Sequence, residues 1–215
     1  MITMKTINAS NQEERDAFFT SLDQRTGETN QRVTETVSEI IRTVKAGGDE
    51  AVKNYTLKFD GSLPEYYEVP RDVINDALTN ADGEFVSAML NAIENVRDFH
   101  QRQVQEGFIN ALPNGVILGQ RVRGLERVGL YVPGGTAAYP SSVIMNAVPA
   151  KIAGVKEIIM VTPPCKDGTP NPDILVAAGL CGVDRVFLSG GAQAIAALAY
   201  GTEFVRSCRS ISAHC

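Results

Sequence analysis

The stretch VGLYVPGGTAAYPSSVIMNAV, residues 128–148, contains the three parts of a ligand-binding loop in an α/β sheet. Val128 to Val132 is short and apolar, as a buried strand is, and Pro133-Gly134-Gly135 ends it. The apolar segment behind Ser141 then predicts a helix. A glycine loop between a strand and a helix start points backbone N–H groups at a bound phosphate. The adjacent glycines do not match the G-x-G-x-x-G dinucleotide fingerprint, so the pattern alone predicts a ligand loop without identifying the ligand.

The same order of strand, loop and helix recurs twice downstream. A buried strand at 157–161 ends at Thr162-Pro163-Pro164, and a second at 183–188 ends at Ser189-Gly190-Gly191. The expected helices are 141–153, kinked or split at Pro149, then 173–180 behind the cap Asn171-Pro172, and 192–199. This alternation predicts a parallel sheet with right-handed crossovers, in which both glycine loops lie at the carboxyl ends of the strands.

The chain before this region is mainly helical by its pattern. Apolar positions recur at helical spacing from Thr29 until Gly47-Gly48, and Asp49 can cap a second helix that ends at Asp60-Gly61. Pro70 starts another helix, and a longer one carries an apolar stripe from Phe85 to Phe99. Residues 116–122 then alternate between apolar and polar, which predicts a half-exposed strand.

Composition limits the classes of function. Apolar residues make up 44% of the 215 and charged residues 21%, as in an ordinary globular protein. The net charge of −5 argues against binding to nucleic acid or to an anionic membrane. The apolar runs are too short to span a bilayer, and the N-terminus lacks the pattern of a signal peptide. We therefore expect a cytoplasmic protein.

The residues that bind metals or act as nucleophiles are scarce. His100 and His214 are the two histidines, and neither has further ligands at metal-site spacing. We expect His100 to lie at a helix edge and the pair His214-Cys215 to be tail. Cys181 reads as a small buried hydrophobe. Cys165 follows two prolines, but a reactive cysteine of the aldehyde dehydrogenase kind would need a better basic partner than Lys166.

Tyr131 and Gln193 are the polar side chains that the pattern places best to meet a ligand. Tyr131 can stack on a nucleotide or form a hydrogen bond with it, and Gln193 offers both a donor and an acceptor at a helix start. In the alternative interpretation Tyr131 packs in the sheet and Gln193 caps its own helix. Ser141 and Ser142 are expected to be helix caps rather than nucleophiles, because no histidine lies nearby to act as a base.

Three stretches of sequence are more specific than the general pattern of strands, loops and helices. They are GLYVPGG at 129–135, SGGAQAIAALAYGTE at 189–203 and KAGGDEAVKNYTLKFDG at 45–61. The chain resembles the histidinol dehydrogenases in these stretches. The resemblance implies NAD-dependent oxidation of L-histidinol to L-histidine through L-histidinal, with zinc holding the substrate and a glutamate–histidine pair moving protons. It implies that Tyr131 and Gln193 contact NAD. It also implies a homodimer.

The resemblance implies a division of the chain. It predicts an N-terminal arm at 1–24, the mainly helical first part of one Rossmann-like half at 25–125, and the first part of the NAD-binding half at 126–205. After Val205 the family continues with a short strand and Gly-Pro-Gly-Asn, whereas residues 206–215 read RSCRSISAHC. We therefore expect a divergent, non-native tail, a truncated Rossmann-like α/β fold, and a shifted reading frame or damaged gene rather than a natural short relative.

Two hypotheses about function follow. In the first, the chain is the N-terminal part of a histidinol dehydrogenase whose zinc ligands and catalytic residues all lie beyond it, so that it is inactive alone. In the second, it is a nucleotide-binding or oligomerising fragment without catalytic activity. On both, a sheet that stops after Val205 is expected to leave an unpaired strand edge.

Overall fold

The computed structural model describes residues 7–8, 10–134 and 138–213, with the side chains of 22–30 left aside. The chain divides into two compact units, residues 1–42 and 43–215. Helix α1 (Gln12–Asp60) supplies the described helical residues of the first unit and continues into the second. Gly48 interrupts it with φ 53° and ψ −136°, at the glycine pair that the sequence predicted as a stop.

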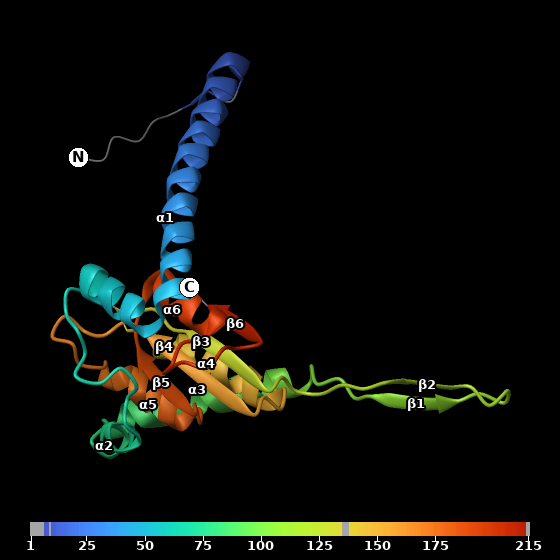
Figure 1. The fold of residues 1–215 in the computed structure, drawn as a ribbon. Helices are drawn as coiled ribbons and strands as arrows, with labels where there is room; N and C mark the ends of the chain where they lie inside the picture. The colour runs from blue at the N-terminus through green and yellow to red at the C-terminus, as the bar shows by residue number, and fades with distance from the viewer. Residues whose placement is uncertain (1–6, 9, 135–137, 214–215) are drawn as a thin grey trace. The chain divides into compact units, whose positions relative to one another are not determined.

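A parallel sheet in the order β5-β4-β3-β6 forms the centre of the second unit (Figure 1). Its strands are β3 (Arg127–Tyr131), β4 (Glu157–Thr162), β5 (Arg185–Leu188) and β6 (Ser210–Ala213). The helices between them are α4 (Pro140–Ile152), α5 (Pro172–Leu180) and α6 (Gly191–Tyr200). This is the Rossmann-like α/β fold that the sequence predicted, with the strand order reversing between β3 and β6.

The two faces of the sheet are covered by different helices. Val128, Leu130 and Val132 belong to one buried cluster with the apolar residues of α4 and α5. Successive side chains of a strand point to opposite faces, so Gly129 faces the other way. A Cβ added to Gly129 would lie 2.9 Å from the Leu198 side chain of α6. Helices α4 and α5 therefore cover one face of β3 and α6 covers the other.

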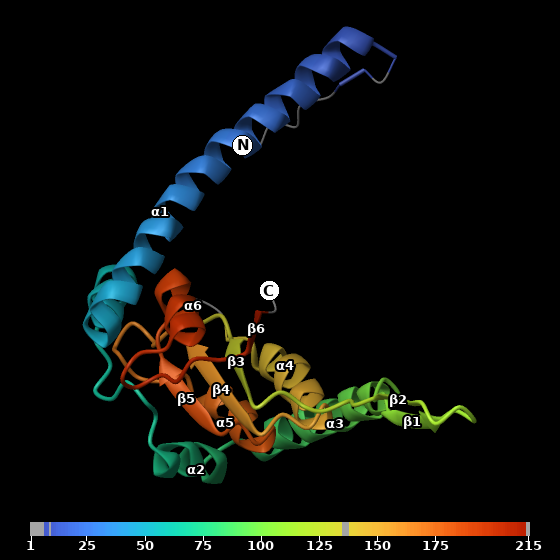
Figure 2. The same cartoon turned by 45° about the vertical axis from the view of Figure 1, so that its right-hand side comes forward.

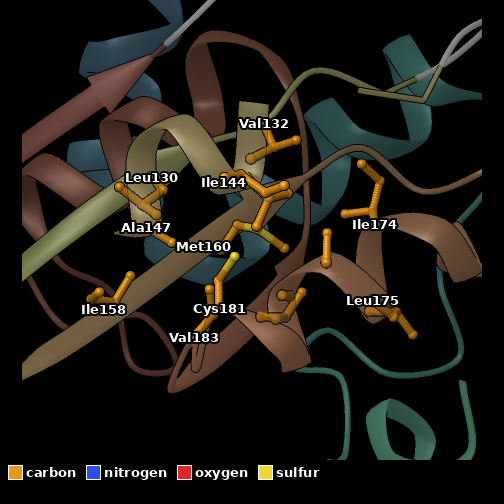
Figure 3. Packing of buried hydrophobic residues seen from close by; sticks show 14 of the residues in the cluster. Leu130, Val132, Ile144, Ala147, Ile158, Met160, Ile174, Leu175, Cys181 and Val183 are labelled. Carbon is orange, nitrogen blue, oxygen red and sulfur yellow. The ribbon is translucent and has the colours of Figure 1, made fainter. Parts of the chain in front are cut away.

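Two further helices form an outer layer over α4 and α5. Helix α2 (Arg71–Thr79) packs on α5, and α3 (Gly83–Gln101) packs on α4. Figure 3 shows the core beneath them, where Cys181 lies among Met160, Val183 and other apolar side chains of the sheet and of α4 and α5. Cys181 is thus the small buried hydrophobe that the sequence predicted. Phe99, by contrast, is 62% exposed and does not continue the buried stripe of α3.

Both edges of the β3–β4–β5 sheet are paired, which corrects one expectation. The backbone N–H of Val69 donates to Val186 and that of Leu188 donates to Tyr67, so a short segment covers the edge of β5. The other edge, that of β3, is paired by β6, in which Val128 lies opposite Ser210 and Tyr131 opposite Ala213 (Figure 2). The unpaired edge expected after Val205 therefore does not lie at β3; it lies at β6, which pairs with no second strand among the described residues.

Three local expectations were wrong in whole or in part. Residues 116–122 hold the predicted strand, β2 (Ile117–Gln120), but its residues are all exposed rather than half-exposed. It pairs with an unpredicted and equally exposed strand, β1 (Phe108–Ala111), in an antiparallel hairpin. Helix α4 is not split at Pro149, which lies in its last turn, where little of the helix remains to be disturbed. Asp49 does not cap a helix, because its Oδ2 accepts from the Phe204 backbone N–H at 3.1 Å.

No helix among the described residues combines the length and the hydropathy that a membrane span requires.

Gly124 provides a test of how tightly this unit is packed. A Cβ at Gly124 would lie 2.2 Å from the carbonyl oxygen of Gly154, and backbone cannot move aside as a flexible side chain can. We expect Gly124→Ala to lower the free energy of unfolding by about 1–3 kcal/mol, the usual cost of overpacking. Gly83→Ala is the control, since nothing lies within 4 Å of its Cβ position in α3. Urea unfolding of both variants measures the difference, and equal stabilities would contradict the packing.

The cysteines are expected to differ in reactivity. Burial raises the pKa of the Cys181 thiol to about 12, and it raises that of Cys208 to about 11. Because the thiolate is the reactive form, both should resist alkylation at pH 8 in the folded chain, whereas the partly exposed Cys165 reacts. Peptide mass spectrometry after a timed pulse of iodoacetamide gives the order, and denatured protein is the control. Alkylation of Cys181 as fast as Cys165 would show that the core opens.

Candidate functional site

The carboxyl ends of β3, β4 and β5 bring both glycine loops to one place. A Cβ at Gly134, in the loop after β3, would lie 3.1 Å from the Pro163 carbonyl oxygen. A Cβ at Gly190, in the loop after β5, would lie 2.6 Å from Cγ of the same proline. Pro163 follows β4, so the two loops flank it at one edge of the sheet, where parallel α/β sheets bind their ligands. Gly135, the second glycine of the first loop, lies outside the described residues.

Gln193 is the least satisfied polar side chain of this edge. It lies in the first turn of α6 and is 1% exposed, and neither its Nε2 nor its Oε1 has a hydrogen-bond partner among the described residues. Gln193 therefore does not cap its own helix, which was the alternative interpretation. Leaving a buried amide unpaired costs about 1–3 kcal/mol, so the position calls for an explanation beyond packing.

The amide of Gln193 lies over the start of its own helix. A Cβ at Gly191 would be 2.6 Å from the Gln193 Oε1, and Gly191 has a positive φ of 62°. A side chain at residue 191 would therefore be strained by its backbone and would collide with the amide. Gly190 thus leaves room for Pro163, and Gly191 leaves room for the amide of Gln193.

Tyr131 is the last residue of β3 and is partly buried. It follows Gly129 by two positions, so its side chain lies on the face of the sheet that α6 covers. Gln193 belongs to α6, and the structure therefore places both predicted residues on the same side of the sheet, close to its carboxyl edge. Whether they contact a nucleotide remains a prediction.

The helix that follows the first loop begins differently from what the sequence predicted. The N-cap of α4 is Tyr139, without a side-chain cap, and Pro140 occupies the first helical position. Ser141 and Ser142 are already inside the helix, so the expectation that they cap it was wrong. Helix α6 likewise has no side-chain cap at Gly190. The first N–H groups of such helices remain available to an anion.

Three side chains, those of Thr56, Tyr67 and Ser189, form a largely buried polar cluster beside the second glycine loop. The hydroxyls of Thr56 and Ser189, both fully buried, lie 3.3 Å apart. Burial raises the pKa of Tyr67, and a hydrogen bond with the Ser189 side chain lowers it in part. Tyr67 is therefore a neutral phenol at physiological pH. The cluster joins the end of β5 to the last part of α1, which contains Thr56. The sequence did not predict this contact because Thr56 and Ser189 are far apart in the chain.

The described residues do not fit a zinc ion. Among them, no group of three or more His, Cys, Asp or Glu side chains could hold a metal. The Nδ1 of His100 lies 2.7 Å from the Gln103 Oε1, near the end of α3. His214 and Cys215 lie outside the described residues.

Comparison with known proteins agrees with the fold and with the motifs. The family model for histidinol dehydrogenase matches residues 23–213, a range that includes β6. The histidinol dehydrogenase of Clostridium acetobutylicum is 53% identical over 188 residues, which are 87% of this chain and 44% of that protein. That of Bacillus subtilis is 49% identical over 170 residues, 79% of this chain and 40% of that protein.

A solved structure gives the same result in three dimensions. The crystal structure of histidinol dehydrogenase from Elizabethkingia anophelis superposes with a TM-score of 0.78 at 35% sequence identity. It covers 83% of this chain, which in turn spans 41% of that one. The chain thus spans less than half the length of these relatives. With the family model matching most of its residues, this chain belongs to the histidinol dehydrogenase family.

Proposed function

We propose that this chain carries the NAD-binding site of a histidinol dehydrogenase, the enzyme that oxidises L-histidinol to L-histidine through L-histidinal. The observation that carries the proposal is the buried amide of Gln193, which finds no hydrogen-bond partner in the described part of the chain, at the carboxyl edge of a Rossmann-like sheet. An amide in this position can donate one hydrogen bond and accept another. A bound dinucleotide would supply both partners and remove the cost of leaving them unpaired.

The residues at this edge have separate roles in the proposal. The N-terminus of α6 carries the positive end of the helix dipole and no side-chain cap, so its N–H groups can receive a phosphate. Gly134 lets the backbone of the first loop approach closely, since it already touches Pro163. Tyr131 offers a ring and a hydroxyl to the nucleotide. Bound NAD would supply the acceptor for the hydride that leaves the alcohol.

The proposal assigns no described residue of this chain to zinc binding or to the pair that transfers protons. The described residues offer no metal-ligand group, and the chain has two histidines in all. By analogy with the family, we propose that zinc binding and acid–base chemistry belong to residues outside the described part of the chain. We also propose, by analogy with the family, a cytoplasmic protein that forms a homodimer.

The role of Gln193 can be tested by a substitution that should stabilise the unliganded chain and weaken its binding of NAD. Gln193→Leu keeps the approximate volume and removes the unpaired polar atoms. We expect the free energy of unfolding without ligand to rise by about 1 kcal/mol or more, and the Kd for NAD to rise about tenfold or more. Urea unfolding and isothermal titration calorimetry measure the two. Gln101→Leu, at the exposed end of α3, is the control and should change neither.

A result that keeps NAD affinity unchanged in Gln193→Leu would remove this residue from the binding site. A loss of stability would show that the Gln193 amide has a hydrogen-bond partner within the folded chain.

The chain as it stands is expected not to oxidise histidinol. General acid–base catalysis alone is worth about 10²–10⁴-fold, and loss of the metal would remove more. The assay follows NADH absorbance with purified chain, histidinol, NAD and added zinc, with the Clostridium acetobutylicum enzyme as the active control. Turnover above a blank of zinc without protein would mean that residues of this chain carry the chemistry.

A further inference from the structure

A basic pocket of about 540 Å³ lies at the amino ends of the strands, opposite the glycine loops. This volume is in the range of small-ligand sites. Its lining contains four cations and one carboxylate. The charged residues are Arg121, Arg123, Lys156, Arg209 and Glu126.

Backbone contacts of the sheet bring the four cations together from three segments. The Lys156 N–H donates to the Leu125 carbonyl at 3.3 Å, which joins the approach to β3 with the approach to β4. The Arg209 N–H donates to the Arg127 carbonyl at 3.1 Å, which adds the approach to β6. The contact of Gly124 with Gly154 holds the first of these segments against the turn after α4. The backbone positions of these four residues are therefore set by the fold.

Nearby carboxylates do not neutralise this group of cations. Glu157 is bound to Arg127, with 2.6 Å between the nitrogen and the oxygen. Asp184 is bound to Lys151 at 3.1 Å and accepts the Ile158 N–H. None of the four lining cations forms a salt bridge within the described part of the chain. Like charges held near one another repel, and a multiply charged anion would relieve the repulsion.

We infer that this pocket binds the phosphate chain of a small polyphosphate anion. Arginine guanidinium groups match phosphate oxygens in pairs, and a lysine adds a point charge. Three arginines and a lysine outnumber the one carboxylate in the lining, Glu126. This excess of positive charge favours a ligand with several negative charges over one with a single carboxylate. The shared chemistry is a di- or triphosphate, either as the inorganic ion or as part of a nucleotide.

This site is distinct from the proposed NAD site. The five residues of β3 separate the basic pocket at the amino end from the glycine loop at the carboxyl end, a span of about 16 Å at roughly 3.3 Å per residue. Occupation of one site therefore does not require the other, and failure of NAD binding would leave this inference standing.

The test compares two variants of the full chain, with tripolyphosphate as the probe in isothermal titration calorimetry at low ionic strength. Arg123→Gln with Lys156→Gln removes two lining cations, and we expect the Kd to rise about tenfold. Arg102→Gln with Lys166→Gln removes the same charge elsewhere and should change the Kd less than about twofold. Arg102 pairs with Asp98 and is exposed, and neither control residue lines the pocket. Circular dichroism melts establish that all variants fold.

A second arm with ATP separates the sources of the anion. Equal affinity for ATP and tripolyphosphate, lost together in the pocket variant, identifies the phosphate chain as the recognised part. ATP binding at least tenfold tighter, again lost in that variant, identifies a nucleotide. The inference is overturned if tripolyphosphate does not bind, or if the pocket and control variants weaken it equally.

Discussion

Strand β3 is the constraint on which the rest of the second unit depends, because its two edges and its two faces are all occupied. It pairs with β4 on one edge and β6 on the other, while α4 packs on one face and α6 on the other. Gly129 makes the second face possible, since a side chain there would collide with Leu198. A strand held in this way fixes the positions of both of its ends. Each end carries one of the two proposed anion sites.

The carboxyl edge illustrates how a binding site can oppose stability. The Gln193 amide is buried and has no hydrogen-bond partner among the described residues, and ordering Gly191 costs conformational entropy, so both features cost free energy in the unliganded chain. The surrounding apolar core offsets these costs, since the strands β4 and β5 are nearly all buried. Such costs persist where the surrounding structure fixes the geometry, which is why they are informative about function.

The sequence predicted the parts of this structure that follow from local pattern, and it missed those that depend on contacts between distant residues. The strands at 157–161 and 183–188, the Asn171 cap and the alternation of β with α could be read from hydrophobic runs and turn residues. The basic pocket could not, because Arg123, Lys156 and Arg209 meet only through the pairing of three strands. Of the hairpin β1–β2, the alternation at 116–122 predicted the strand β2, whereas β1 and its pairing with β2 were missed, and both strands are fully exposed.

The tail after Val205 shows how little a strand at the edge of a sheet requires of its side chains. Pairing in a sheet is made by backbone N–H and C=O groups, which every residue except proline supplies. β6 has no proline, and its four residues pair with β3 while only Ile211 is partly buried. Ile211 lies opposite Gly129, where the partner strand has no side chain to compete for space. The Ser212 hydroxyl donates to the Asn146 Oδ1 of α4 at 2.6 Å and adds one specific contact. An edge position of this kind demands little of the side chains, so a short segment can occupy it as long as one apolar residue falls in the right register.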